Sequence, residues 1–139
     1  MFVDTAVFLY AKGTPHPYRD PCRTVLSAIG AGAVDGVVNV DVIQEFVHVR
    51  IRKGIDRDEA AIESQGIVAS CQVEDVGMAD LLVALKFFAS FQSLDLRDAI
   101  HLATATRTLV DGIVSSDRGF DSVPGVMRLD PIDFAVQVG

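Results

Sequence analysis

The sequence predicts an α/β protein with a mostly parallel, twisted central sheet of about four to five strands flanked by helices. Short apolar runs alternate with longer amphipathic segments along the chain, which is the pattern of strands joined by crossover helices. Sheets of this kind are covered on both faces. With 139 residues, of which 50% are hydrophobic, the chain has room for one domain over residues 1–139 and a substantial core.

The first half of the chain predicts two strands and four helices. Glycines at positions 13, 30 and 54 end predicted helices, while Thr5, Asp20 and Asp56 are N-cap residues, with Pro21 at the first helical position after Asp20. The expected elements are a strand at 1–3, a helix at 5–11, a helix after Asp20-Pro21 ending near Gly30, a strand at 36–39, a helix at 42–51 and a helix from Asp56 to about 70.

The second half continues the alternation. A short strand at 72–76 precedes a strongly apolar helix at 78–92 and a helix at 96–109 that has Asp98 in its first turn. A strand at 112–115 ends near Asp117, and residues 126–129 are expected to form the last strand. The tail from Pro131 onward has no pattern that predicts an element.

Four acidic residues occupy positions that such a fold brings together. Asp4 ends the first strand and Asp117 follows a late one, Glu45 lies early in a helix, and Asp98 opens another. Ligands of parallel α/β sheets gather outside the carboxyl ends of the strands. Clustered carboxylates repel one another unless they are protonated or held by a hard cation such as Mg²⁺ or Mn²⁺. We therefore predict a divalent-metal site, although Asp4 and Asp98 taken alone are equally explained as helix-capping acids.

Residues beside these acids have two interpretations each. His101 lies one turn after Asp98 among small apolar residues and is a core histidine or a ligand, and we favour a core histidine with a hydrogen-bond partner. Arg97 and Arg118 are candidates for phosphate contact or solvated surface arginines. Asp121 is an extra ligand or a solvated acid, and we favour the solvated acid.

Five stretches carry a resemblance to a known family. They are Phe2-Val3-Asp4-Thr5-Ala6, Gln44-Glu45-Phe46, the run 96–105 from Leu96 to Ala105, the run 113–120 from Ile113 to Phe120, and the closing run 124–131. In these stretches the chain resembles the PIN-domain nucleases, and most closely the toxins of VapBC toxin-antitoxin systems. The resemblance implies a PIN-like fold and a metal-dependent endoribonuclease, with metal ligands at Asp4, Glu45, Asp98 and Asp117. Ser115 stands at the auxiliary hydroxyl position, where relatives often have Thr.

The same resemblance implies partners. Such toxins cleave RNA, pair through helices into homodimers, and are silenced by a small cognate antitoxin that lays an apolar helix on the toxin and sends a basic side chain toward the acids. The apolar helix at 78–92 carries Leu and Phe around more of its circumference than one core face needs, so it is either fully buried or an interface.

Composition excludes several classes of protein. The formal net charge of −7 disfavours non-specific nucleic-acid binding by the whole chain, although Arg50, Arg52, Lys53 and Arg57 allow a local basic face. No apolar run reaches the ~20 residues of a membrane span, and the start does not resemble a signal peptide, so we expect a cytoplasmic protein. Cys22 and Cys71 have no metal-binding spacing and are expected to be buried thiols.

Three other functions agree less well with the sequence. Glu45-x-x-His48 and Asp98-x-x-His101 echo the carboxylate-histidine pairs of di-iron helical bundles, but such bundles contain no sheet. A phosphoaspartate enzyme would need an acid at position 6, where this chain has Ala6. The alternative from a different class is a catalytically inactive PIN-like binding or scaffold domain, for which the loss of one or more acids would be the signature.

Overall fold

All strands of the protein lie in one parallel sheet, in a computed structural model that describes residues 1–139. The sheet has five strands in the order β3-β2-β1-β4-β5. Their bounds are β1 Phe2–Val3, β2 Val37–Asn39, β3 Gln72–Glu74, β4 Ile113–Val114 and β5 Arg128–Leu129, and all four neighbouring pairs are parallel. The predicted α/β fold is confirmed, and the di-iron helical bundle is excluded.

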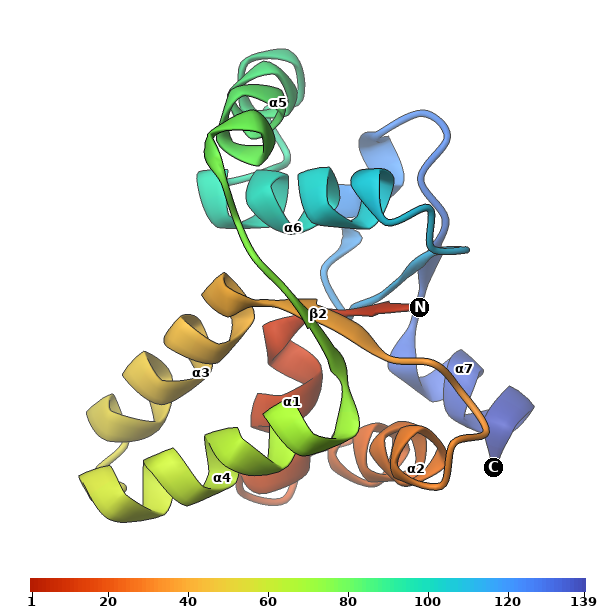
Figure 1. The fold of residues 1–139 in the computed structure, drawn as a ribbon. Helices are drawn as coiled ribbons and strands as arrows, with labels where there is room; N and C mark the ends of the chain where they lie inside the picture. Colours follow the sequence, from red (N-terminus) through yellow and green to blue (C-terminus); the bar gives the residue numbers. More distant parts are fainter.

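Helices cover both faces of this sheet. Helices α5 and α6 lie on one face, and α1 to α4 and α7 lie on the other (Figure 1). The bounds are α1 Thr5–Lys12, α2 Arg19–Gly30, α3 Val40–Arg52, α4 Arg57–Ser70, α5 Met78–Ser90, α6 Leu96–Arg107 and α7 Pro131–Val138, with a 3₁₀-helix η1 at Arg118–Ser122.

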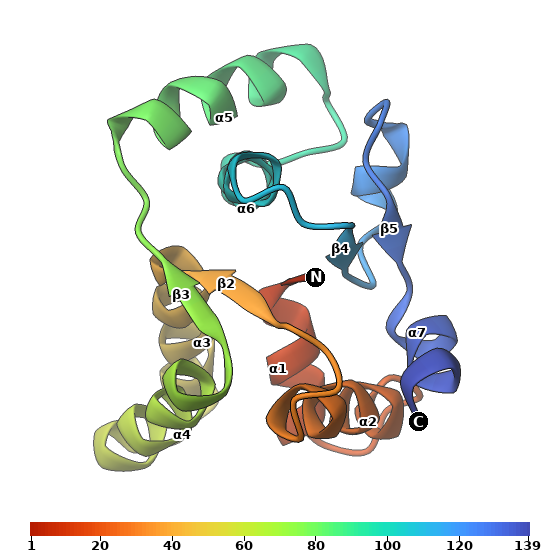
Figure 2. The same ribbon diagram turned by 45° about the vertical axis from the view of Figure 1, so that its right-hand side comes forward.

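The strand order creates a switch point between β1 and β4. Phe2 in β1 pairs with Val37 of β2 on one side and with Ile113 of β4 on the other. The connections from β1 to β3 run through α1 to α4 on one face, and the connection to β4 runs through α5 and α6 on the opposite face (Figures 1 and 2). Neighbouring strands whose connections leave toward opposite faces open a crevice at their carboxyl ends. Residues that follow β1 and β4 therefore meet in that crevice.

The core is built on very short strands. Val3, Val38 and Val114 are fully buried within the sheet, and Phe46 of α3 and Phe120 of η1 pack into the same apolar cluster. Parallel strands covered on both faces are continuous apolar runs, which is why β1, β2 and β4 could be recognised from sequence. Because each strand has only two or three residues, side-chain packing rather than the hydrogen-bond ladder holds the sheet together.

Two of the three predicted N-cap residues were wrong. Helix α1 is capped by Asp4, whose side chain accepts from the Thr5 N–H, so Thr5 is its first helical residue. Helix α2 begins at Arg19, with Tyr18 as its N-cap residue, so Asp20 and Pro21 lie inside the first turn, where proline is tolerated because it lacks only an N–H that has no helical partner. The tail forms a helix: Asp130 caps α7 by accepting a hydrogen bond from the Ile132 N–H (3.0 Å), and Pro131 is its first residue. The predicted cap at Asp56 is confirmed.

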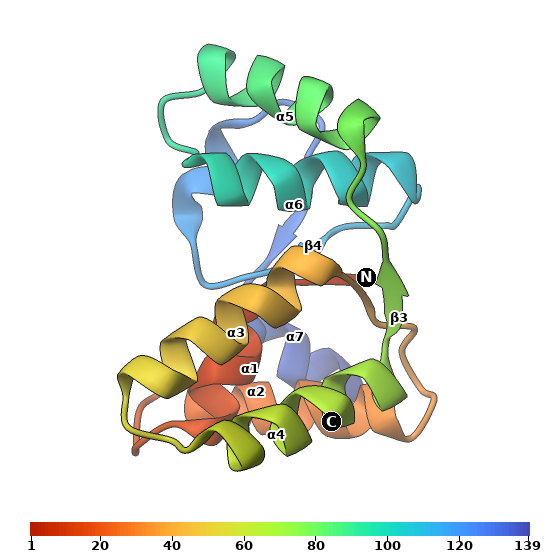
Figure 3. The same ribbon diagram turned by 60° about the vertical axis from the view of Figure 1, so that its left-hand side comes forward.

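Helix α5 packs mainly against one neighbouring helix, α6. It packs on the outer side of α6, away from the sheet (Figure 3), and its buried residues are Asp80 and Ala84. The exposed large apolar residues of α5 are Met78, Leu82, Val83, Leu85 and Phe88. Of the two alternatives for this helix, full burial is therefore excluded, and the outer face of α5 is apolar and open. None of the helices has both the length and the apolar character needed to cross a bilayer.

The remaining side-chain predictions are only partly confirmed. Cys22 is a buried free thiol as expected, whereas Cys71 is only partly buried. Arg50 does not belong to a basic surface, because it is buried and its guanidinium donates to both carboxylate oxygens of Glu63, at 2.8 and 2.9 Å. The exposed cations of that segment are Arg52, Lys53 and Arg57.

Candidate active site

Asp4 lies in the crevice at the carboxyl end of β1. Its backbone N–H donates to the Val114 carbonyl (3.1 Å), which fixes it beside the end of β4. One carboxylate oxygen accepts from the Thr5 N–H (2.8 Å) and so caps α1, and the other accepts from the Ser115 hydroxyl (2.5 Å). Burial raises the pKa of Asp4, while the hydrogen bonds from Ser115 and Thr5 act in the opposite direction. Asp4 is therefore both a helix cap and a buried acid of the crevice.

Ser115 joins Asp4 to Asp117. Its side chain is fully buried, and its hydroxyl accepts a hydrogen bond from the Asp117 N–H (3.0 Å) while donating to Asp4. The Asp117 carboxylate is exposed and accepts from the Gly119 N–H (2.8 Å), which starts η1. A Cβ at Gly119 would lie 2.5 Å from the Ser93 carbonyl oxygen, so this turn requires glycine. One buried hydroxyl thus sets the positions of two candidate ligands.

Glu45 reaches the crevice from the second turn of α3. Its Oε2 accepts from the Thr5 hydroxyl (2.8 Å) and lies 3.4 Å from Nε2 of His101. The hydrogen bond with His101 is the largest of the causes that lower the pKa of Glu45, followed after the opposing effect of burial by the Thr5 hydroxyl. Glu45 is therefore an ionised carboxylate that the fold orients from two sides.

A buried amide determines how His101 bonds to Glu45. The Asn39 side-chain oxygen accepts from the Val42 N–H (3.0 Å), so its amide nitrogen faces Nδ1 of His101 (3.3 Å) and Thr104 Oγ1 (2.8 Å). An amide nitrogen can only donate, which makes Nδ1 the acceptor and leaves the ring proton on Nε2, directed at Glu45. His101 is a core histidine as expected, with a partner that is itself a site acid. Sequence reasoning missed the site contacts of Thr5, which follows β1 by two residues, and of Asn39, which is the last residue of β2. Their only signal was this closeness to the carboxyl end of a strand.

Asp98 completes the set from the first turn of α6. Its N–H is capped by Asp95 (2.8 Å), but its carboxylate makes no hydrogen bond or ion pair with the protein. Burial raises the pKa of Asp98 to about 7, assisted by the negative charges of Asp95, Asp4 and Asp117. Because Asp4 and Asp117 both act on this carboxyl, the structure brings all three acids into one electrostatic neighbourhood.

These side chains fit a hard divalent cation by their chemistry. As they stand they do not form a closed cage, since no group of three or more His, Cys, Asp or Glu side chains lies close enough to bind one ion. The reason is that Asp4, Glu45 and Asp117 are each directed at a partner of their own, namely Ser115, Thr5 with His101, and Gly119. Oxygen donors with several negative charges are nevertheless what Mg²⁺ and Mn²⁺ prefer, and the uncompensated Asp98 marks where a cation would relieve repulsion.

The charged residues near the four acids differ in how closely they are paired. Arg97 makes only loose contacts, 3.6 Å to Glu45 and 3.9 Å to Asp95, and its side chain is 60% exposed. Arg128 binds both carboxylate oxygens of Asp121, at 2.8 and 3.1 Å. Asp121 is therefore the partner of an arginine, which agrees with the preference against a ligand role and specifies what occupies the carboxylate.

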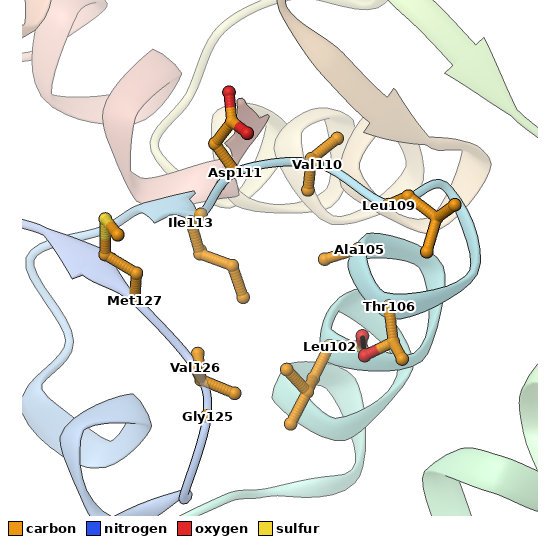
Figure 4. Close-up of a pocket in the computed structure, with 11 residues that line it drawn as sticks. Leu102, Ala105, Thr106, Leu109, Val110, Asp111, Ile113, Gly125, Val126 and Met127 are labelled. Carbon is orange, nitrogen blue, oxygen red and sulfur yellow. Dashed lines mark hydrogen bonds between the residues drawn. The ribbon is translucent and has the colours of Figure 1, made fainter.

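An apolar hollow elsewhere on the molecule is distinct from this crevice. About 290 Å³ in volume, it lies at the amino end of β4 and is lined by residues such as Leu102, Ala105, Val126 and Met127 (Figure 4). It contains none of the four acids. The four acids lie at the opposite ends of the strands, where β1 and β4 end.

Replacing His101 tests the orientation of Glu45. We expect His101→Ala to lower activity at the acidic site about 10- to 100-fold, the range for partners that orient ligands. Stability should fall by about 1–3 kcal/mol because one buried N–H of the Asn39 amide loses its acceptor. His101→Gln retains a donor and should recover part of the activity. Thr104→Val, which removes the hydroxyl that bonds Asn39 and the Ile100 carbonyl but leaves His101 in place, is the control. Equal activity in all four folded proteins would show that His101 does not position Glu45.

The sequence of the chain is similar to those of known proteins. The family model described as the PIN domain matches residues 1–126. Ribonuclease VapC7 of Mycobacterium tuberculosis is 34% identical over 131 residues, covering 93% of this chain and 90% of that protein. VapC ribonuclease Mb1869c of Mycobacterium bovis is 29% identical over 131 residues, covering 93% of this chain and 98% of that protein.

Two solved structures share the architecture at low sequence identity. Mycobacterium tuberculosis VapC20, a sarcin-ricin loop cleaving toxin, superposes with a TM-score of 0.73 at 14% identity and covers 91% of this chain and 95% of its own. A chain of a toxin-antitoxin complex from Klebsiella pneumoniae superposes with a TM-score of 0.69 at 14% identity, covering 94% and 96%. At this identity the two structures establish the fold.

Proposed function

Since the chain belongs to the PIN domain family, and to the VapC ribonucleases within it, we propose that it is a metal-dependent endoribonuclease and the toxin of a toxin-antitoxin pair. The observation that carries this proposal is the acidic crevice between β1 and β4, where Asp4, Asp98 and Asp117 share one electrostatic neighbourhood and Ser115 fixes two of them. The proposed unit is a single domain over residues 1–139.

The proposed roles follow from how each acid is held. Asp4 and Asp98 are direct ligands of Mg²⁺ or Mn²⁺, and Glu45 and Asp117 act partly through water or orient the attacking water. A bound divalent ion supplies Lewis-acid chemistry, since it acidifies water and offsets charge on the phosphoryl oxygens. Ser115 keeps the Asp4 carboxylate in place, Thr5 and His101 keep Glu45 turned toward the crevice, and Arg97, loosely paired and exposed, is available to a phosphate.

An inactive scaffold domain is the alternative function. All four acids are present, and Asp98 is a partly buried carboxyl without a partner in the protein. A domain without chemistry has no reason to retain such a group, because its ionised form costs free energy. Incubating the purified protein with total RNA and mapping the 5′ and 3′ ends of the fragments distinguishes the two, since the scaffold would leave RNA intact.

We propose that the chain acts in a type II toxin-antitoxin system, as the family resemblance implies. We propose a small cognate antitoxin as the protein partner, RNA in the cytoplasm as the substrate, and a homodimer as the assembly. The exposed apolar face of α5 supports an assembly, because contiguous exposed apolar surface marks interaction sites.

If the chain forms a homodimer through α5, a charge placed on the open face of that helix should weaken the dimer. The wild-type protein should sediment as a dimer at micromolar concentration, and Phe88→Glu, which places a charge on the open face, should shift it toward monomer. Val136→Glu on α7 is the matched control, since Val136 is even more exposed (82%) but lies on another surface. A wild-type monomer, or equal dissociation by both variants, would count against the proposed interface.

A further inference from the structure

A hollow beside Glu45 is lined entirely by polar or charged side chains. Its residues are Asp41, Gln44, Glu45 and His48 of α3 and Arg97 of α6, and its volume is about 320 Å³. Positions 41, 44, 45 and 48 are three or four residues apart, so they share one face of the helix. The hollow is therefore a continuation of the acidic crevice along α3.

Three of these side chains have no task in the fold. The side chains of Asp41, Gln44 and His48 make no hydrogen bond or ion pair, whereas Glu45 in the same hollow is bonded to Thr5 and His101. Solvated polar residues are common on surfaces. What distinguishes these three is that they converge on a hollow shared with a candidate catalytic carboxylate, with their hydrogen-bonding groups unused.

The hollow continues away from the acids. A second one, of about 610 Å³, shares Gln44 and His48 and adds Val47, Ile51, Arg57 and Ala61 between α3 and α4. Arg57 is exposed and makes no ion pair, and Ile51 is partly exposed. A single strand leaving the acids along α3 would therefore pass first a polar hollow, then apolar surface and a free cation, which is the order that suits a base followed by a phosphate.

We propose that the polar hollow binds one unpaired base of the RNA next to the scissile phosphate, and that it prefers adenine to uracil. This inference rests on the proposed ribonuclease function and specifies how that site selects its substrate. Asp41 only accepts hydrogen bonds and therefore suits the exocyclic amino group of adenine, which uracil lacks. Gln44 both donates and accepts, as in bidentate pairing with adenine. The planar groups of Arg97 and His48 offer surfaces for stacking.

The test is base preference measured position by position. Single-stranded oligoribonucleotides randomised around the cleavage site are incubated with protein and Mn²⁺, and the fragment ends are sequenced. The wild type should favour A over U at one position beside the cut. In Gln44→Ala and in Asp41→Ala this ratio should fall about tenfold or more, the range for one lost base contact. Gln65→Ala, an exposed glutamine of α4 that lines neither hollow, should keep the wild-type ratio.

The outcomes separate the base site from the nuclease itself. Cleavage with the same base ratios in the wild type and both variants, or with no preference in the wild type, overturns the base site and leaves the nuclease intact. A wild type that cuts no RNA with Mn²⁺ overturns the proposed function. Binding of A- and U-containing oligonucleotides by the Asp4→Asn protein gives a second measure that needs no cleavage, and equal affinities there also overturn the base site.

Discussion

Asp98→Asn and Asp4→Asn are each expected to reduce RNA cleavage by more than about 100-fold. Partners that merely orient ligands are worth about 10- to 100-fold, and a direct ligand should cost more. Asn keeps the shape of the side chain but removes the charge that would hold a divalent cation. The measurement is the initial rate of cleavage with Mn²⁺. Asp133→Asn, an exposed acid in the first turn of α7, is the matched control and should cleave at the wild-type rate.

Asp98→Asn should reduce activity without reducing the stability of the metal-free protein. The pKa of Asp98 is raised from 3.8 to about 7 in the folded protein, so the folded state binds its proton more tightly than the unfolded state. The metal-free wild type therefore loses stability as the pH rises from about 4 to about 7, and the loss persists above. Asp98→Asn removes this effect, so its melting temperature should be at least that of the wild type at pH 8, with a smaller difference at pH 5.

Calorimetry on metal-free protein checks the sign. Asp133→Asn should show no comparable change between the two pH values. If Asp98→Asn melted well below the wild type at pH 8 and still cleaved RNA, Asp98 would be a structural residue and its assignment as a ligand would be wrong.

The second large effect is expected from the product of the adjacent gene. The proposed antitoxin lays an apolar helix on the surface of the chain and directs an Arg or Lys into the acidic crevice. A guanidinium can pair with two carboxylate oxygens at once, so it replaces the cation and the complex should contain little metal. We expect the co-purified complex to have less than about 1% of the activity of the free chain, a loss that a few kcal/mol of displaced metal binding is sufficient to cause.

A variant of the antitoxin provides the control. Replacing its basic residue with Ala should preserve binding, which depends on apolar burial, and restore metal content and activity. Stripping the partner from the wild-type complex should do the same. A fully active complex, or no bound protein partner, would refute the toxin-antitoxin proposal without touching the nuclease proposal.

The acids at the ends of strands were the part of the site accessible to sequence. Asp4 and Asp117 follow apolar runs, and the rule that carboxyl ends of parallel strands share an edge brings them together. Ser115 was included because the family resemblance implies a hydroxyl two residues before the last acid. The resemblance to PIN-domain nucleases of the VapC type is confirmed by the comparisons. The catalytic roles of the four acids stay predictions.

The residues that sequence missed act across long separations. Thr5 bonds Glu45 over 40 positions and Asn39 bonds His101 over 62, and neither pairing has a local pattern. Such contacts depend on how α3 and α6 pack across the sheet, which periodicity does not encode. The sequence likewise did not pair Arg128 with Asp121.

Two Asp-Pro pairs show why helix starts are hard to predict. Asp130-Pro131 begins α7, whereas Asp20-Pro21 lies inside the first turn of α2. The difference is tertiary: the Tyr18 hydroxyl donates to Asp130 (2.8 Å), and its ring packs against Tyr10 and His16. Those contacts fix the residue before α2 and move its start one residue ahead of the dipeptide.

The metal dependence of RNA cleavage by the purified chain tests the central proposal most directly. We predict that fragments with new internal ends accumulate with Mn²⁺ or Mg²⁺, that excess EDTA stops their formation, and that Asp98→Asn forms none under either condition. Cleavage that continues undiminished in EDTA, or that Asp98→Asn performs at the wild-type rate, would contradict a metal-dependent ribonuclease at the crevice between β1 and β4.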